Sequence, residues 1–345
     1  MRLLFSVKSK LTKTFSPSDK IDAFLIELGM FCFSFLFVET KAQAQTLFVT
    51  PQAMSQFLRL SPTTIEPKQE TERLFELQFG KTWSNYWAND KRFFLDGQTT
   101  EDRLQVGWNI YHSFRLQMEY IRKSLSGLAM DDVAIGFHRG FGIPQDKRLD
   151  YSKNRNQFSI PDHGLDLNTV DRDRALAEQL ALTSIFRKRW QGFDVGLAMT
   201  VAEEVSRQGL RDKTQKDFLW QTALGKSFGL HYATANFNWL YSDTLSDRLY
   251  LNNHQRSLRL VYSYALASNL WANLEAFISE SPFVDIGQLS KNSYEIYSGV
   301  VWNYENYVFQ AALIENILWP FNSPDWGFML SIGSYWISDQ SRQKF

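Results

Sequence analysis

The chain has 345 residues, of which 44% are apolar and 15% aromatic, and 37 basic side chains balance 37 acidic ones. The sequence has no basic patch of the kind that binds nucleic acid. It also has no run of about twenty apolar residues that could form a membrane-spanning helix. The single cysteine, Cys32, excludes an internal disulfide and a Cys-based metal site.

The first 44 residues have the layout of a cleaved signal peptide. Four lysines between positions 8 and 20 precede the uncharged stretch Gly29–Val38, and Ala42–Ala44 forms an A-x-A site. We therefore expect export, with Gln45 as the first mature residue. The alternative is an amphipathic or buried N-terminal helix.

Residues 45–71 contain Pro51, Pro62 and Pro67 in a Thr- and Gln-rich context. Because such a composition is typical of irregular chain, this segment is predicted to be a periplasmic lead-in or a strap that enters the fold, not a strand.

Twelve later segments alternate apolar with polar residues. In one of them, Leu104, Val106 and Trp108 alternate with Gln105 and Gly107. Successive side chains of a strand point to opposite faces, so each segment is predicted to be a strand. Their lengths fit the roughly 9–11 residues of a tilted membrane-spanning strand. The predicted strands are 72–83, 101–112, 114–123, 175–187, 191–201, 217–226, 229–241, 256–266, 269–280, 293–303, 305–317 and 325–336.

The connections alternate between short and long. Short turns, such as the one near His112, alternate with the longer links 84–100, 124–174, 202–216, 242–255, 281–292 and 318–324. Outer-membrane barrels have tight periplasmic turns and longer external links. The pattern predicts an all-β protein, a transmembrane antiparallel β-barrel of about twelve strands over residues 72–336, with a C-terminal tail at 337–345 and both termini in the periplasm.

A soluble β-sandwich also has alternating strands. Charge placement favours the barrel, because the apolar face of the segments is nearly free of charge. Arg or Lys on a lipid face costs roughly 2–4 kcal/mol at the membrane midplane, and a barrel enforces this segregation. The aromatic residues, which include 11 Trp, fit membrane-interface girdles.

The polar face of the strands is predicted to line the lumen. It would form a hydrated, mildly acidic path or a hydrogen-bonded network that fills the barrel. Twelve strands lie between packed eight-stranded barrels and open channels of roughly sixteen. The expected lumen-lining residues are Glu76, Gln105, Asn109, Arg115, Gln117, Glu119, Asp194, Arg259, Glu275 and Glu295, together with Gln78, Gln221, Asn236, Asn238, Asn273 and Gln310.

The link 124–174 contains the sequence DDVAIGFHRGFGIP at Asp131–Pro144. Its period-two alternation suits a short extended piece, whereas the spacing of Val133, Phe137 and Phe141 would place them near one helical face. The glycines count against a long helix.

Apolar residues of this link need burial, so we expect residues 131–158 to fold at or into the barrel mouth. In this hypothesis Arg148 or Arg155 pairs with a lumen acid such as Glu119. The candidate gating residues are Asp132, His138, Phe141, Gly142, Pro144 and Arg148.

The same motif, followed by Arg148 and by residues 154–158, resembles an uncharacterised family of Gram-negative outer-membrane proteins, a domain-of-unknown-function family. Leu47–Val49 with Pro51, Trp83–Asn85 and Ser281–Pro282 are also similar to it. The resemblance covers roughly residues 46–333. It implies the fold and the outer-membrane location, and no activity comes with it. The chain departs from many outer-membrane barrels at its polar tail, where only Phe345 is aromatic.

Catalytic readings find little support in the sequence. His138 and Asp132 are candidates for an acid–base or metal pair, but a capping Asp and a hydrogen-bonded His that fix the fold of the link are the favoured interpretation, because nothing else completes a site. Gly225–Gly229 matches G-x-S-x-G but joins two predicted strands, whereas a nucleophile elbow lies between a strand and a helix. Neither His112 nor His231 has a serine partner at a convincing cross-strand position.

We therefore expect an outer-membrane barrel that acts as a conduit for small solutes. A structural or surface-interaction barrel is the alternative, and a lipid-active enzyme is a third. The expected partners are outer-membrane lipid, the barrel-assembly machinery and a small solute of unknown identity. No cofactor and no metal are expected.

Overall fold

The computed structural model describes residues 46–53, 60, 64–68, 73–125, 130–142, 148, 150, 156–163, 165–168, 175–205, 216–242, 251–316 and 324–337. All of them belong to one compact unit, Thr40–Phe345. The expected signal peptide and nearly all of the expected C-terminal tail lie outside the described residues. No helix in the described part is long and apolar enough to span a membrane.

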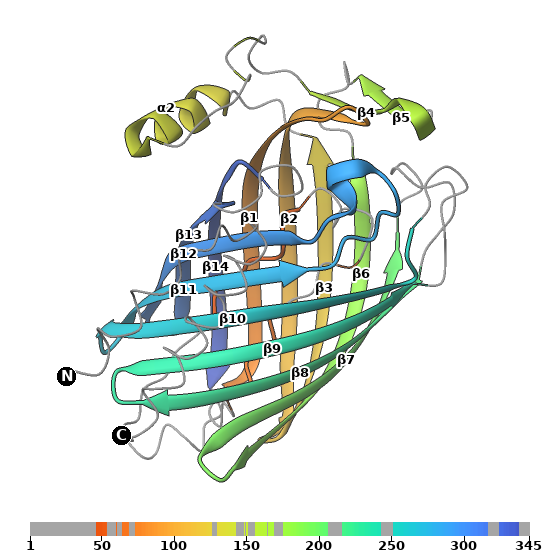
Figure 1. The fold of residues 1–345 in the computed structure, drawn as a ribbon. Helices are drawn as coiled ribbons and strands as arrows, with labels where there is room; N and C mark the ends of the chain where they lie inside the picture. Colours follow the sequence, from red (N-terminus) through yellow and green to blue (C-terminus); the bar gives the residue numbers. More distant parts are fainter. Residues whose placement is uncertain are drawn as a thin grey trace, which may run out of the picture. The chain divides into compact units, whose positions relative to one another are not determined.

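Twelve antiparallel strands close into a barrel (Figure 1), because β1 pairs with both β2 and β14 while every other strand pairs with its neighbours in the chain. The barrel strands are β1 (Arg73–Asn89), β2 (Phe94–Tyr111), β3 (Phe114–Leu125), β6 (Ala175–Trp190), β7 (Phe193–Glu204), β8 (Lys216–Phe228), β9 (His231–Ser242), β10 (His254–Ala267), β11 (Leu270–Ser279), β12 (Ser293–Tyr304), β13 (Tyr307–Glu315) and β14 (Trp326–Ile337).

The predicted strand order is confirmed. Five hairpins, which join β2–β3, β6–β7, β8–β9, β10–β11 and β12–β13, have two-residue turns. In the β6–β7 turn, Gln191 and Gly192 both have positive φ, 49° and 80°. This conformation matches the right-handed twist of the two strands and explains the tight reversal.

The prediction of a long link at 84–100 is wrong. β1 continues to Asn89 and β2 begins at Phe94, which leaves only residues 90–93 as a connection. Ser84, Asn85, Tyr86, Trp87 and Ala88 are all buried, so both faces of this part of β1 are covered. Period-two alternation requires one covered and one exposed face, and the strand signal is therefore lost here.

The link 124–174 contains helix α2 (Asp131–Phe141) and a small hairpin of β4 (Gln157–Ile160) and β5 (Leu165–Asn168), with the 3-10 turn η3 (Pro161–His163) between its strands. Residues 131–141 are therefore helical and not extended. The helix ends at Gly142, whose φ of 68° permits the left-handed cap that stops it. β4 pairs with the end of β2 (Figure 1).

An apolar cluster lies at the long-link end of the barrel. It joins the extended ends of β1 and β2 to β4 and to the link around η4 (Gly287–Ser290). Its buried side chains include Tyr86, Phe93, Phe158, Phe283 and Leu289. We refer to this set as the lid cluster.

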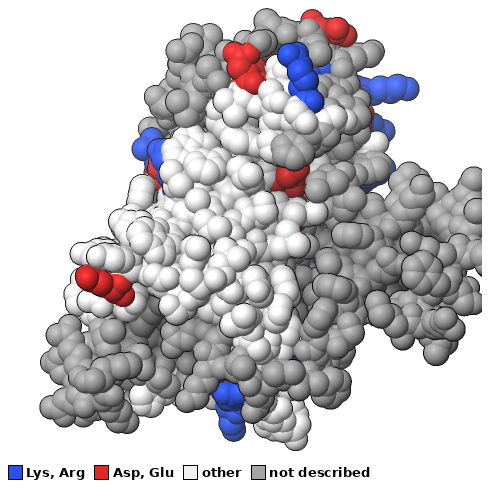
Figure 2. Space-filling model, turned by 90° about the vertical axis from the view of Figure 1, so that its left-hand side faces the viewer, with Lys and Arg blue, Asp and Glu red and all other residues white. Residues whose placement is uncertain are grey.

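The outward face of the strands is apolar, as the alternation predicted. Leu77, Phe79, Leu104 and Leu182 are among its exposed side chains. Figure 2 shows a broad uncharged surface on one side of the molecule, with few charged residues scattered around it. Two pairs of outward charges connect neighbouring strands, Lys81 with Asp102 at 2.8 Å and Arg122 with Glu178 at 3.2 Å.

Candidate functional site

Polar and apolar residues share the inward positions of the barrel wall, and the residues predicted to line the lumen lie at these positions. Glu76 and Asn109 are half-buried, and the others are buried. The buried set comprises Gln105, Arg115, Gln117, Glu119, Asp194, Arg259, Glu275 and Glu295, and also Gln78, Gln221, Asn236, Asn238, Asn273 and Gln310.

Most charges of the wall lie in cross-strand ion pairs. The pairs are Arg103–Glu119, Arg115–Glu76, Arg259–Glu275 and Lys123–Glu101. Sequence reasoning did not single out Glu101, Arg103, Lys123 or Asp217. Each of them has the same inward parity as a predicted lumen residue on its own strand, so the parity rule alone would have found them.

The chain's own N-terminal segment fills the lumen. We refer to its described residues, 46–53, 60 and 64–68, as the N-terminal strap. Leu47, Val49, Thr50 and Ala53 are each at most 2% exposed. Of the two expectations for residues 45–71, the structure therefore agrees with a strap inside the barrel for the part that it describes.

Barrel-wall carboxylates hold the main chain of the strap. The Glu295 carboxylate accepts the N–H groups of Gln52 and Ala53, both at 2.8 Å. Glu275 accepts the N–H of Leu47 at 2.8 Å. A strap without sheet partners must satisfy its main-chain groups in another way, and these side chains do so.

Apolar side chains anchor the strap at three places. Leu47 and Val49 belong to a cluster with Tyr232, Trp271 and Tyr297 of the wall. Ile65 and Leu60 pack in two smaller clusters against β6, β7 and β8. Burial of a large aliphatic side chain stabilises by roughly 1.5–3 kcal/mol, so these anchors favour the inserted strap.

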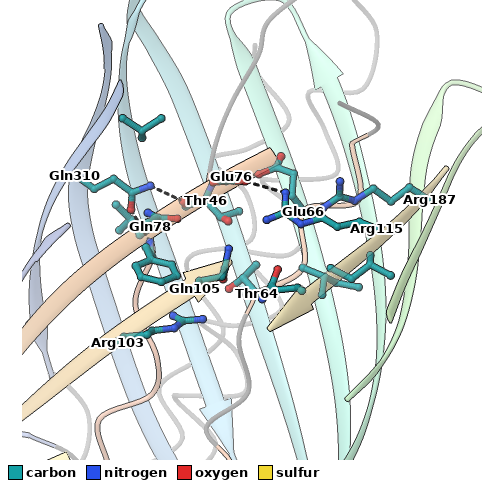
Figure 3. A pocket seen from close by; sticks show the side chains of 16 residues that line it. Thr46, Thr64, Glu66, Glu76, Gln78, Arg103, Gln105, Arg115, Arg187 and Gln310 are labelled. Carbon is teal, nitrogen blue, oxygen red and sulfur yellow. Dashed lines mark hydrogen bonds and ion pairs between the residues drawn. The ribbon is translucent and has the colours of Figure 1, made fainter. Parts of the chain in front are cut away.

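Little open space remains between strap and wall. A cavity of about 70 Å³ lies beside Thr46 and Glu66, and arginines from three strands, Arg103, Arg115 and Arg187, line it (Figure 3). This volume has room for a few water molecules. In the part of the chain that the structure describes, the strap therefore occupies the lumen beside the wall residues that bind it.

A second polar site joins helix α2 to the wall. Arg148 Nη2 contacts Asp131 Oδ1 at 2.6 Å, and the guanidinium also donates to Asn85 and Asp325. Asp131 is 4% exposed and Arg148 5%. Asp325 immediately precedes β14, so this buried cation connects the link to β1 and β14. We refer to these four residues with His138 and Glu315 as the polar clamp.

His138 occupies the centre of the polar clamp and is 1% exposed. Its Nε2 lies 3.2 Å from the main-chain oxygen of Asp325 and 3.5 Å from Oε1 of Glu315. Burial lowers the pKa of His138, but the hydrogen bond with Glu315 and the negative charge of Asp325 outweigh this effect and raise the pKa above its ordinary value.

The polar clamp brings together Asn85, helix α2 and Arg148, which come from three segments that the sequence motifs singled out. Two hypotheses are wrong, namely that His138 pairs with Asp132 and that Arg148 pairs with Glu119. His138 faces Glu315 and Asp325, whereas Asp132 lies on the exposed face of α2. Arg148 pairs with Asp131 and Asp325, and the proposed partner Glu119 is bound to Arg103.

The position of α2 also differs from the expectation. The helix packs against Trp83, Trp326 and Phe328, which share the outward parity of β1 and β14. Only β4 joins the lid cluster at the mouth. The plug is therefore the N-terminal strap and not residues 131–141. Gly142 is exposed, while Pro144, Arg155 and the Phe141 side chain lie outside the part of the chain that the structure describes.

The remaining candidates for catalysis make structural contacts. His231 Nδ1 lies 2.6 Å from the Tyr262 hydroxyl, and His112 occupies the β2–β3 turn. A Cβ atom at Gly225 would come within 2.3 Å of the Tyr232 hydroxyl, so close packing explains that glycine. No group of His, Cys, Asp and Glu suited to a metal ion occurs among the described residues.

Solved structures of outer-membrane channels are similar to this chain at low identity. The "KdgM porin" is 6% identical, with 76% of this chain and 99% of that chain covered and a TM-score of 0.42. The "COG4313 outer membrane channel from Pseudomonas putida F1" is 10% identical, with 79% of this chain and 100% of that chain covered and a TM-score of 0.49. The "CymD monoaromatic hydrocarbon channel" is 9% identical, with 78% of this chain and 90% of that chain covered and a TM-score of 0.39.

No curated protein matches the chain. A family model does match residues 28–336, and the chain therefore belongs to the family described as "Protein of unknown function (DUF3187)".

Proposed function

We propose that this protein is a gated conduit for small polar solutes in the outer membrane, with the N-terminal strap as its gate. The observation that carries the proposal is the way in which the lumen is filled. Much of its wall is polar, and the segment inside it is held in part through main-chain hydrogen bonds to side chains of the wall.

Such a filling can exchange with water. Water can replace the hydrogen bonds to the strap, and the net contribution of each bond to a charged carboxylate of the wall is about 1.5–3 kcal/mol. When the strap leaves, it uncovers a polar passage in which ion pairs such as Arg115–Glu76 remain bound to each other.

The outer-membrane location is part of the proposal. The apolar outward face of the barrel suits lipid, and the alternating short and long connections suit periplasmic and external ends. Export would use the signal peptide 1–44, and assembly would use the barrel-assembly machinery. N-terminal sequencing of the protein from outer membranes should start at Gln45, and an intact Met1 there would contradict this step.

Single-channel conductance tests the gate. We expect the refolded protein to show rare, short openings, and a variant that lacks residues 46–68 to conduct for most of the recording. Asn238→Ala is the matched control, because Asn238 is a buried wall residue whose side chain contacts Gln221 and Ser257. Heat-modifiable migration on gels confirms that each variant is folded. A folded deletion variant without current would refute the gate.

A structural or surface-interaction barrel is the second candidate, and the closed lumen favours it. Both the lid cluster and the strap would then be permanent parts of the fold. The same recordings separate the two functions, because a permanently filled barrel stays silent in the full chain and shows only unstable leakage when the strap is removed.

A further inference from the structure

Side chains of the barrel wall bind the strap through the strap's main-chain N–H and carbonyl groups. Besides the carboxylate contacts described above, Gln310 Oε1 accepts the N–H of Phe48 at 2.6 Å, and Asp217 accepts that of Leu60 at 2.6 Å. Acceptors of the wall therefore reach consecutive and separated N–H groups of the segment. Every polypeptide without proline at these positions offers the same groups.

Donors of the wall reach the carbonyl groups of the same segment. Arg259 Nη1 donates to the carbonyl oxygen of Val49 at 2.8 Å, and the Tyr86 hydroxyl donates to that of Gln52 at 2.5 Å. Gln310 also donates to the carbonyl of Thr46 at 3.4 Å. Arg259 and Tyr86 are at most 1% exposed, so both donors are fixed within the wall.

Side chains of the segment alternate between two environments. Leu47 and Val49 enter the apolar cluster of Trp271 and Tyr297. Phe48, which lies between them in the chain, packs under the guanidinium of Arg103 at 3.9 Å from its ring centroid. Main-chain hydrogen bonds combined with pockets for alternate side chains are the usual basis for binding an extended peptide.

We propose that the lumen wall around Arg259, Glu275, Glu295 and Gln310 is a binding site for a polypeptide segment with aliphatic residues at alternating positions. The strap occupies this site within its own chain, and a peptide from another molecule takes its place when the strap leaves. The inference rests on the proposed function for the departure of the strap, and it adds polypeptide to the ligands of the lumen.

A cut strap provides the test. A protease site placed between Lys68 and Arg73 allows the barrel to fold with the strap inside and then to release it as a separate peptide. A fluorescent peptide of residues 45–60 is added to the cut barrel in detergent micelles, and binding is measured by anisotropy. We expect one peptide to bind per barrel and to displace the original strap.

An N-methylated peptide is the matched control. Methyl groups on the main-chain nitrogens of Leu47, Phe48, Gln52 and Ala53 remove the four donors and keep every side chain. We expect at least a tenfold loss of affinity. A peptide with Leu47 and Val49 exchanged for each other keeps the alternation and should bind within about threefold of the original. Equal binding of the methylated peptide, or no exchange at all, overturns the proposal.

A second measurement uses the uncut chain, in case the cut barrel unfolds. A Gln52→Cys variant carries the only thiol within residues 45–345, because the natural Cys32 lies outside them. Excess peptide should speed up thiol labelling by displacing the strap, and the methylated peptide should not. No difference between the two peptides would also overturn the proposal.

The outcomes separate this inference from the proposed function. Current through the strap-deleted barrel without peptide binding keeps the conduit and removes the peptide site. Peptide binding without current removes the conduit and keeps the site. Block of the current by the peptide, with no block by its methylated form, supports both.

Discussion

Arg148 Nη2 lies 2.6 Å from Oδ1 of Asp131, seventeen positions earlier in the chain. The same guanidinium contacts Asn85 and Asp325, which belong to the opposite ends of the strand sequence. One buried cation thus fixes helix α2 to the point where β1 and β14 close the barrel. The sequence motif around Asp131 therefore has a structural role in the described part of the chain, whatever passes through the lumen.

Arg148→Met should detach α2 from the wall. The change leaves buried Asp131 and half-buried Asp325 without their cation, and removal of one partner of a buried ion pair costs about 3–5 kcal/mol. We expect proteolysis in the link 143–156 to accelerate while the barrel itself stays folded. Arg139→Ala, an exposed change on the same helix, is the control. Equal proteolysis of the two variants would show that Arg148 is not needed to hold the helix.

The attachment of α2 should weaken as the pH rises. The folded pKa of His138 lies above its ordinary value of 6.5, so the protonated form binds more strongly in the folded state. This contribution is complete below about pH 6.5 and disappears as the pH rises through the raised folded pKa. The facing groups are Glu315, Asp325 and Arg148.

Hydrogen exchange of the α2 amides between pH 6 and pH 9, corrected for the intrinsic rate, measures this effect. We expect protection to fall with rising pH in the wild type. His138→Gln should be less protected at pH 6 and should show no such fall. A wild-type profile as flat as that of the variant would contradict the assignment.

Gly80→Ala should loosen the strap. A Cβ at Gly80 would lie 2.8 Å from Cδ1 of Phe48, and that ring is already held between Gly80 and Arg103. Overpacking of this kind costs typically about 1–3 kcal/mol, which here favours departure of the strap. We expect longer channel openings. Gly136→Ala is the control, because no atom lies within 4 Å of the added Cβ.

The strands could be predicted because lipid and lumen impose opposite chemistry on alternate residues. That signal fails where the surroundings change. Residues 84–88 are covered on both sides, so β1 appeared to end too early. The strap shows no alternation as long as that of a spanning strand, and several of its contacts run from main-chain N–H groups to single wall residues such as Glu295.

The polar clamp could not be predicted from the sequence for a different reason. His138 and its partner Asp325 are separated by 187 positions, and no local spacing connects them. The choice between neighbours was also open, because Asp131 and Asp132 differ only in the helical face they occupy. Once residues 131–141 are known to be helical, the burial of Asp131, Ala134, Ile135 and His138 follows the helical repeat.

Glu295→Gln should weaken the strap at the point where one side chain holds two main-chain donors. The carboxylate accepts the N–H groups of Gln52 and Ala53, and Tyr297 donates to it as well. An amide offers one oxygen and turns an NH₂ group toward the second donor. Hydrogen bonds to a charged group contribute about 1.5–3 kcal/mol, so the loss of one shifts the strap toward departure roughly tenfold or more. We expect open probability and labelling of a Gln52→Cys thiol to rise together. Asn238→Ala should change neither, and a strap as protected in Glu295→Gln as in that control would mean that the apolar anchors Leu47 and Ile65 suffice to keep the gate closed.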